Sequence, residues 1–442
     1  MRALLVFVAA LLVPVAAVGA AGGLGGSPPA DPADRAVADD PVVAQADGTV
    51  TLQQINVLDV PASGVERSSV GGHYVDLGPS VGLSTNATTD RLRTLEMVER
   101  VEAAETATER RERLRTAFRA FEADVDDLDR RQTAEIRAYN RNDLSSRELL
   151  VSLVRFSTVA EEYNTRRARL ESLAAETPGF ELDRGRLASI GNRLSAFTGP
   201  VRTHAGAVLR GEADPTRFYL ATGTESVTVT TVVDGDYLRE SYRGDLRNGE
   251  GNAMELEVAL DIVSASYPII WNTTREQTQV FGGGETYPVR IAHSRGDLTA
   301  FVDSNARVVY AEHQRRSLDT VVADDRFERS NGGIRLSVNH TYPGGPVRIQ
   351  AIDESTGDPL DADVSMAVGS GESAPVGTTG EDGVLWTLSP NRQYTVAVEA
   401  LGESAEVVIA PGTLPRVERV TADGNDGGGG SGNATATPTP TG

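Results

Sequence analysis

The residue types that most often carry catalysis or bind metals are sparse in this chain of 442 residues. It has no cysteine, and all 42 of its basic residues are arginine. Disulfides, thiolate catalysis, thiolate zinc sites and lysine Schiff bases are therefore excluded. The histidines lie far apart in the sequence, so none forms a local zinc-binding pair. They are His73, His204, His293, His313 and His340.

Two clusters of aspartates could bind a cation. The first falls on an expected helix and lacks the glycine turn of a calcium-binding loop, which favours a solvated helix face. The second surrounds an expected turn of a β-sandwich, where exported proteins sometimes bind calcium. The clusters are Asp124, Asp126, Asp127 and Asp129, and Asp353, Asp358, Asp361 and Asp363. A pair of glycosidase carboxylates could also lie among the 63 acidic residues, but no spacing singles one out.

Sequence motifs for cofactors give no positive signal. The stretch FGGGET, residues 281–286, is rich in glycine but lacks the strand-to-helix context of a phosphate-binding loop, which favours a flexible loop. We find no G-x-S-x-G elbow, P-loop or dinucleotide fingerprint. The sequence therefore predicts no catalytic residue, no metal ligand and no cofactor.

The amino-terminal sequence indicates export. Arg2 is followed by an apolar run, residues 3–18, and then by small residues, which predicts a secretory signal peptide at residues 1–20. A short anchor that is never cleaved is the alternative. Four Asn-X-Thr acceptor patterns for N-glycosylation agree with an extracellular or cell-surface location. They begin at Asn86, Asn272, Asn339 and Asn433.

The charge of the chain restricts its partners. The formal net charge is −21 and the pI is about 4.7, so a nucleic-acid partner is not expected. Membrane contact is expected only through an uncleaved amino terminus or through a partner. Acidic excess, arginine without lysine and a Thr/Pro-rich end together resemble secreted proteins of halophilic archaea. A dense carboxylate surface keeps such proteins soluble where salt screens charge repulsion.

The first half of the chain predicts a helical domain. A disordered lead, 21–48, and an extended segment, 49–88, precede a long antiparallel helical hairpin domain at 89–214. Thr89 is the expected cap of the first helix, which continues to Asn140. Its second half has a coiled-coil seam formed by Leu114, Phe118, Phe121, Val125 and Leu128. Ser145 and Glu148 form a capping box for the second helix.

The second half of the chain predicts strands. A central α+β domain, 215–335, contains a hairpin with its turn at Asp234-Gly235. A β-sandwich follows at 345–411, with Trp386 in its core, and a Gly/Ser and Thr/Pro tail occupies 421–442. The fold class is thus a multidomain α and β protein with a helical hairpin, a central α+β domain, a β-sandwich and a disordered tail.

Three resemblances extend this interpretation. The stretch FVDSNARVVYAEH, 301–313, faintly resembles the PepSY module of secreted peptidase propeptides, although Ala306 replaces the usual turn glycine. The order Thr356-Gly357, Pro359-Leu360, Asp382-Gly383 and 394–396 resembles archaeal fibronectin-III-like and carboxypeptidase-regulatory-like sandwiches. The stretch 56–92 and the helices to about residue 173 resemble uncharacterised exported proteins of haloarchaea, which implies no particular activity.

These observations favour a non-catalytic protein of a high-salt archaeal envelope. It would serve as a spacer or as a protein-interaction module, with a protein partner or envelope component bound by the helices or the compact domains. Two alternatives remain open at this point. The PepSY resemblance implies an accessory regulator or inhibitor of an exported peptidase, and the many carboxylates allow a hydrolase.

Overall fold

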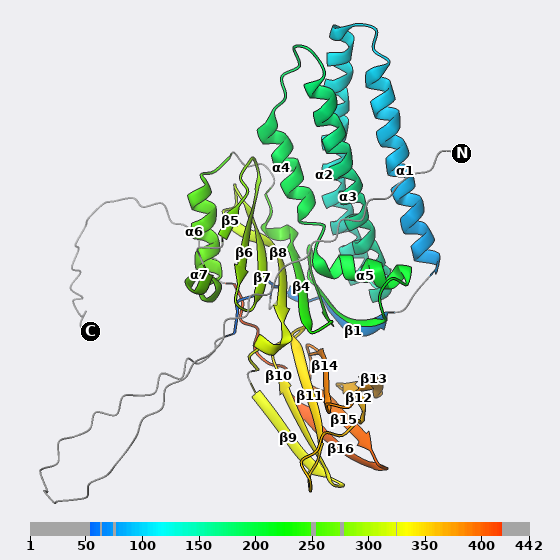
Figure 1. The fold of residues 1–442 in the computed structure, drawn as a ribbon, viewed down its shortest axis with the longest axis vertical. Helices are drawn as coiled ribbons and strands as arrows, with labels where there is room; N and C mark the ends of the chain where they lie inside the picture. The colour runs from blue at the N-terminus through cyan, green and yellow to red at the C-terminus, as the bar shows by residue number, and fades with distance from the viewer. Residues whose placement is uncertain are drawn as a thin grey trace, which may run out of the picture. The chain divides into compact units, whose positions relative to one another are not determined.

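The computed structural model describes residues 54–61, 64–73, 77–248, 253–274, 278–323 and 325–417. The predicted signal peptide, the lead at 21–48, the tail at 421–442 and Asn433 lie outside the described residues. Within the described ranges, no helix combines the length and the apolar character that are needed to cross a membrane. Helices dominate the first part of the chain and antiparallel strands dominate the second (Figure 1).

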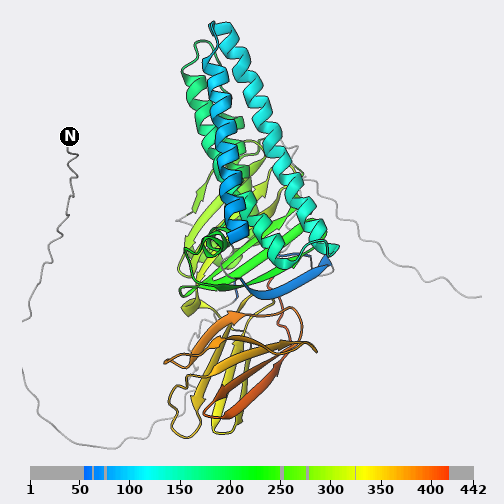
Figure 2. The same cartoon turned by 90° about the vertical axis from the view of Figure 1, so that its right-hand side faces the viewer.

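Three long helices and two shorter ones form the helical part. They are α1 (Leu77–Glu102), α2 (Ala107–Asn140), α3 (Ser146–Ala175), α4 (Arg184–Ser195) and α5 (Pro200–Arg210). The predicted capping box at the start of α3 is confirmed, because the Ser145 hydroxyl accepts from the Glu148 amide while the Glu148 carboxylate accepts from Ser145. Figures 1 and 2 show α1, α2 and α3 alongside one another.

The prediction of a two-helix hairpin that starts at Thr89 is wrong in two respects. Helix α1 begins at Leu77, so the end of the predicted extended segment is helical. The chain then breaks after Glu102, and Thr106 caps α2 by accepting a hydrogen bond from the Glu109 amide. Glycine, proline and threonine give the start of α1 a low helix propensity, and packing of its buried face against α3 overrides that propensity.

The predicted seam of α2 is only partly directed at α3. Phe121 is buried and meets the ring of Tyr163 edge-on at 6.0 Å, as expected for a seam residue. Phe118 instead stacks on Phe180, in the connection between α3 and α4, with ring centroids 5.8 Å apart. The seam therefore turns away from α3 at Phe118, and that part of the prediction is wrong.

The central sheet has eight antiparallel strands in the order β1-β2-β3-β4-β8-β7-β6-β5. They are β1 (Arg67–His73), β2 (Thr216–Thr222), β3 (Ser226–Val233), β4 (Asp236–Arg243), β5 (Thr278–Val280), β6 (Thr286–His293), β7 (Gly296–Asp303) and β8 (Val308–Ser317). The predicted turn at Asp234-Gly235 is confirmed, since both residues have positive φ and join β3 to β4. Strand β1 joins this sheet from the segment before the helices, which the predicted boundaries had kept separate.

The two faces of the sheet carry different layers. Alternation along β4 directs Glu240 and Tyr242 toward the helical side, where they contact residues of α5 and of the α4–α5 connection. Arg239 and Ser241 point to the opposite side, which receives the segment around Asp59. Two further helices, α6 (Leu256–Ser266) and α7 (Pro268–Thr274), follow β4 in the chain, and α6 packs on β6, β7 and β8.

The carboxy-terminal part is a sandwich of two four-stranded sheets, β14-β11-β10-β9 and β13-β12-β15-β16. The strands are β9 (Asp325–Asn331), β10 (Ile334–His340), β11 (Pro346–Asp353), β12 (Asp363–Val368), β13 (Ala374–Thr378), β14 (Val384–Leu388), β15 (Tyr394–Ala400) and β16 (Glu403–Ile409). The predicted start at 345 is too late, because the β9–β10 hairpin pairs with β11 and contributes to the same core.

Trp386 does not lie in the core of the sandwich as predicted. Leu385 packs against that core, and alternation along β14 turns Trp386 to the outer face. There Trp386 packs with Tyr219, Tyr237 and other apolar residues of the central sheet. It therefore belongs to the junction between the sandwich and the sheet.

Candidate functional site

The described acceptor sites for glycosylation differ in accessibility. Asn272 is exposed in α7, whereas Asn86 in α1 and Asn339 in β10 are half-buried. Asn339 also lies inside the sheet ladder, opposite Arg326 on one side and Arg348 on the other. Asn272 is thus the most accessible of the three sites.

The histidines that the structure describes make separate contacts. The ring of His204 lies 2.9 Å from the Thr216 hydroxyl, and Nε2 of His313 lies 3.3 Å from the carbonyl oxygen of Ala196. Burial, together with the charge of Arg202, lowers the pKa of His313 to about 3, so this ring is uncharged at neutral pH. In the described part of the chain, no group of three or more histidine, aspartate or glutamate side chains could hold a metal ion.

The aspartates of the sandwich organise turns. One oxygen of Asp353 accepts hydrogen bonds from the amides of Ser355 and Thr356, at 2.7 and 3.0 Å. Asp361 accepts from the amide of Gly380 at 3.0 Å. Bonds of this kind are how aspartate stabilises tight turns, and they account for these two side chains without a cation.

The aspartates of α2 are not all on a solvated face, which corrects the sequence-based interpretation. Asp129 is largely buried and forms ion pairs with Arg193 of α4 and with Arg247, which follows β4. Its other carboxylate oxygen accepts from the Tyr242 hydroxyl. Asp124 pairs with the buried Arg166 of α3 at 2.7 Å. These ion pairs therefore connect α2 to α3, to α4 and to the segment after β4. The sequence did not predict them, because the arginines that form them lie far from these aspartates along the chain.

The electrostatics of Asp129 follow from this arrangement. Burial alone would raise its pKa, but the guanidinium groups of Arg247 and Arg193 outweigh that effect and hold the pKa below its usual value. Glu285 lies 3.9 Å from both guanidinium groups and extends the cluster. A carboxylate that is charged and held by two arginines is a structural link rather than a general base.

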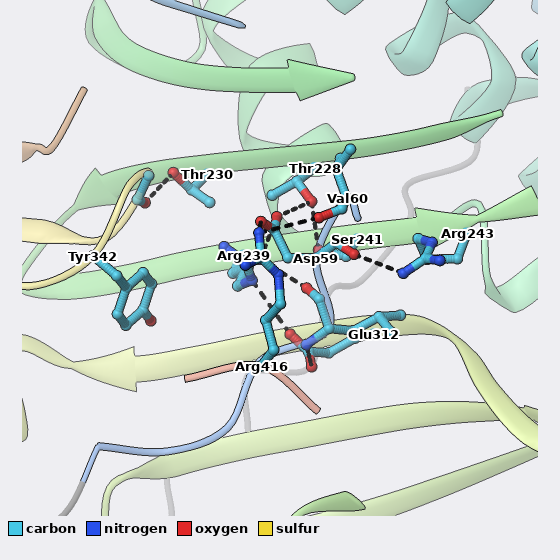
Figure 3. A network of polar contacts seen from close by, with 12 residues as sticks. Asp59, Val60, Thr228, Thr230, Arg239, Ser241, Arg243, Glu312, Tyr342 and Arg416 are labelled. Carbon is cyan, nitrogen blue, oxygen red and sulfur yellow. Dashed lines mark hydrogen bonds and ion pairs between the residues drawn. The ribbon is translucent and has the colours of Figure 1, made fainter. Parts of the chain in front are cut away.

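A second ionic network lies on the opposite face of the sheet (Figure 3). Arg239 is completely buried and bonds to Asp59 at 2.9 Å and to the carbonyl oxygen of Leu58 at 2.7 Å. Its Nε lies 3.4 Å from Glu312 of β8. Asp59 also accepts from the Thr228 hydroxyl of β3 at 2.8 Å. One arginine thus joins two strands to the segment that precedes β1.

Glu312 anchors two further elements to this network. It accepts from the Tyr267 hydroxyl at 2.6 Å and from the Leu58 amide at 2.7 Å. Burial raises the pKa of Glu312, an effect that Arg239 and the two hydrogen bonds only partly offset. Leu58 belongs to the segment before β1, and Tyr267 lies at the end of α6. The carboxyl group of Glu312 therefore connects these two elements.

The chain after the sandwich returns to the same place. Arg416 lies 3.6 Å from Asp59 and donates to the Val60 carbonyl oxygen at 3.4 Å. Val57 forms a parallel bridge with Arg416, and its amide donates to the Pro415 carbonyl oxygen at 2.8 Å. We call residues 55–60 together with 413–417 the terminal clasp. Asp59 and Arg239 thus join both segments of the clasp to the central sheet.

Two grooves flank α2 and have the composition of a binding surface. The first, of about 430 Å³, lies between α1 and α2, and its accessible apolar residues are Met97, Ala117 and Ala120, above the buried Val101 and Phe121. Its rim carries charges of both signs, among them Glu96, Arg100, Glu112 and Arg113. Helix α1 packs mainly on α3 and makes little contact with α2, which leaves this groove open.

The second groove lies on the other side of α2, toward α4. Its volume is about 470 Å³, and its apolar residues are Phe118, Phe180, Leu182 and Leu187. Glu112 lines both grooves, so they are adjacent along α2. An apolar floor with a mixed charged rim suits a protein or peptide partner, because the floor supplies buried area and the rim selects orientation.

A third cavity, of about 660 Å³, opens on the helical face of the sheet beside the start of α5. His204 and His313 line it together with Arg290, Asp297 and Phe301. The two histidines bond to a threonine and to a backbone carbonyl rather than to carboxylates. A nucleophile activated by a carboxylate-oriented base would need a different arrangement.

A fourth cavity, of about 620 Å³, adjoins the Asp129 cluster. It is lined by that aspartate and by Arg130, Arg137, Arg193 and Arg247. The two inner arginines are already paired with Asp129, and Arg137 is paired with Glu225. The charges of this cavity therefore stabilise the packing of α2 on the sheet.

Comparison with known proteins divides the chain into three successive parts. Residues 1–214 match a domain of unknown function (DUF7096), and residues 218–322 match a family of unknown function (DUF7094). Residues 326–407 match the archaeal fibronectin-III type-like domain. The chain thus carries an archaeal fibronectin-III-like domain. That match begins at β9, as the sandwich does. No curated protein and no solved structure matches the chain.

Proposed function

We propose that this protein is an exported, non-catalytic protein of the cell surface that binds a protein partner or envelope component through the two grooves of α2. The observation that carries the proposal is the apolar floor of these grooves, which includes aromatic rings and is bordered by charges of both signs. Aromatic and methionine side chains with a polar rim are typical of protein interfaces.

The fibronectin-III-like domain and the amino-terminal sequence support the proposed location. Domains of this type are common in extracellular proteins, and the signal-like sequence at residues 1–20 and the exposed acceptor Asn272 agree with export. In this proposal the sandwich is a compact spacer, and the helices carry the binding surface. The acidic composition agrees with a high-salt archaeal envelope.

Envelope capture with matched variants tests the binding surface. Ala120 lies in the first groove and is exposed, so Ala120→Glu places a carboxylate on its floor without disturbing the core. Ala134 is exposed on the same helix outside the four cavities, so Ala134→Glu is the matched control. We expect a partner that is retained by the wild type and by Ala134→Glu but lost with Ala120→Glu. Equal capture by all three chains would contradict the proposed surface.

Location is tested independently of binding. Fractionation of the source cells at their native salt concentration should place the protein outside the cytoplasm, and mass spectrometry should show whether residues 1–20 are removed. A full-length protein that stays in the cytosol with this segment intact would refute export. Such a result would leave the groove experiment unaffected.

A further inference from the structure

The terminal clasp pairs the first and the last described segments of the chain in parallel. The Val57 amide donates to the carbonyl oxygen of Pro415 at 2.8 Å, and the Val57 carbonyl oxygen accepts from the Val417 amide at 3.1 Å. The side chain of Asn56 adds a bond to the carbonyl oxygen of Arg416 at 3.2 Å. Because the two segments run in the same direction, the chain enters the clasp at one end and leaves it at the opposite end.

This direction determines how the clasp responds to tension. Pulling the two ends of the chain apart draws 55–60 and 413–417 past each other along their shared axis. All the bonds between the two segments are then stretched together, and each bond carries a part of the force. In an antiparallel pair both ends would leave on the same side, and the bonds would break one after another. The force at which a structure opens depends on its unfolding rate, so the direction of loading matters.

The two segments of the clasp are not held equally firmly. Four side chains of the central sheet bond to the backbone of 55–60 at 2.7 to 3.2 Å, and they are Arg239, Arg243, Glu312 and Gln314. In the described part of the chain, the hydrogen bonds and the ion pair that connect 413–417 to other segments all go to 55–60. Under tension we therefore expect 413–417 to detach while 55–60 stays on the sheet.

The described domains all lie between these two segments along the chain. Helices α1 to α5, the central sheet and the sandwich fall between residues 61 and 412. A force that enters the chain before residue 55 and leaves it after residue 417 passes directly across the closed clasp. The helices, the sheet strands and the sandwich are then outside the path of the force.

We propose that the terminal clasp is a tension-bearing device. While it is closed, it carries force between the two ends of the chain, and when it opens, the sandwich enters the path of the force. Opening frees residues 410–417, which extend by at most about 30 Å. The proposal rests on the proposed cell-surface location, because a protein that is held at one end and bound elsewhere is exposed to such forces.

Pulling single molecules of the full chain in optical tweezers tests the device. The natural chain contains no cysteine, so two introduced cysteines define where the force is applied. Thr51→Cys with Thr421→Cys loads the clasp along its axis. We expect a first step of at most about 30 Å, before any longer step. Unfolding of the sandwich, residues 325–409, would give a step about ten times as long.

Two other attachment pairs are the controls for direction and path. Val65 is exposed and follows 55–60 at the end where 413–417 leaves the clasp. Val65→Cys with Thr421→Cys therefore breaks the bonds one at a time, and the opening force should be lower by at least about twofold. Leu401 is exposed at the turn between β15 and β16, so Thr51→Cys with Leu401→Cys bypasses 413–417 and should show no short step.

A matched pair of substitutions assigns the short step to the clasp. Arg416 lies 3.6 Å from Asp59 and donates to the carbonyl oxygen of Val60, as Figure 3 shows for this network. Arg416→Ala should therefore lower the force of the short step. Arg326→Ala removes an exposed ion pair of β9, outside the path of the force, and should leave the short step unchanged. Circular dichroism establishes that both variants are folded.

Four results would overturn the proposal. A first step with the length of a whole domain would mean that the clasp does not carry the force. Equal opening forces for the two loading directions would refute the role of the parallel pairing. A short step that persists with attachment at Leu401, or that Arg416→Ala and Arg326→Ala leave equally unchanged, would arise elsewhere in the protein. None of these results depends on whether the grooves of α2 bind a partner or on where the cell places the protein.

Discussion

Arg239 is the residue on which the buried network of the sheet depends. It is fully buried between Asp59 and Glu312. Removing it would leave Glu312 without its cation and Asp59 with only the more distant Arg416. We expect Arg239→Ala to lower the free energy of unfolding by about 3–5 kcal/mol, as when one partner of a buried ion pair is removed. Urea denaturation of the full chain measures this loss.

The control for that prediction is an ion pair between an arginine and a carboxylate on the surface of the protein. Arg326 and Glu328 are neighbours on β9, and about half of each side chain is exposed. Solvent screens such pairs, so Arg326→Ala should leave stability nearly unchanged. Equal losses in the two variants would mean that burial does not determine the strength of the Arg239 network.

The ion pairs of Asp129 predict how the free energy of unfolding depends on pH. The folded state holds the pKa of Asp129 below its unfolded value through Arg247 and Arg193. The stabilisation is therefore complete above the unfolded pKa, about 3.9, and is lost as the pH falls through the folded pKa. Asp129→Asn should lower the unfolding free energy by about 3 kcal/mol at pH 7. The difference from wild type should shrink toward pH 2 in urea titrations. A difference that is independent of pH would refute the assigned charge.

At the scale of elements, the packing of α2 on α3 predicts that Phe118 and Phe121 contribute differently to the free energy of unfolding. Phe121 is buried against Tyr163, so Phe121→Ala should cost about 3–5 kcal/mol. Phe118 is only partly buried and rests on Phe180, so Phe118→Ala should cost clearly less. Thermal unfolding of both variants gives the comparison. The reverse order would place the seam of α2 on its other face.

Local sequence signals predicted the elements that local interactions determine. The capping box at Ser145 and the turn at Asp234-Gly235 each depend on a few neighbouring residues, and both are present. The start of α1 depends instead on packing against α3, which a window of sequence does not contain. The start of the sandwich was missed for the same reason, because β9 is recognised by its partners and not by its own composition.

The ionic clusters were beyond sequence analysis for a physical reason. Asp59 and Arg239 are 180 residues apart, and Asp129 and Arg247 are 118 residues apart. No periodicity links such pairs, since the fold alone brings them together. Asp129 also shares its short stretch with aspartates on more exposed positions, so composition predicted a solvated face where one member is largely buried.

For the whole molecule, the terminal clasp joins segments that are remote along the chain. Residues 55–60 precede the helices and residues 413–417 follow the sandwich, and both end at the Arg239 network. The sandwich adds a second contact to the same face of the sheet, because the Gly344 carbonyl oxygen accepts from Thr230 and Tyr237. The central sheet is therefore stabilised by segments from both ends of the described chain.

Shortening the chain tests the clasp at this scale. A chain that ends at Pro411 keeps all strands of the sandwich but loses the bridge to Val57 and the contact of Arg416 with Asp59. It should unfold at a lower temperature than the full chain, because one side of the buried Asp59 loses its cover and its second arginine. A chain that ends at Val420 keeps the clasp and is the control. If both shortened chains melt together with the full chain, the clasp contributes nothing to stability, and the sheet is held by the sandwich and the Arg239 network alone.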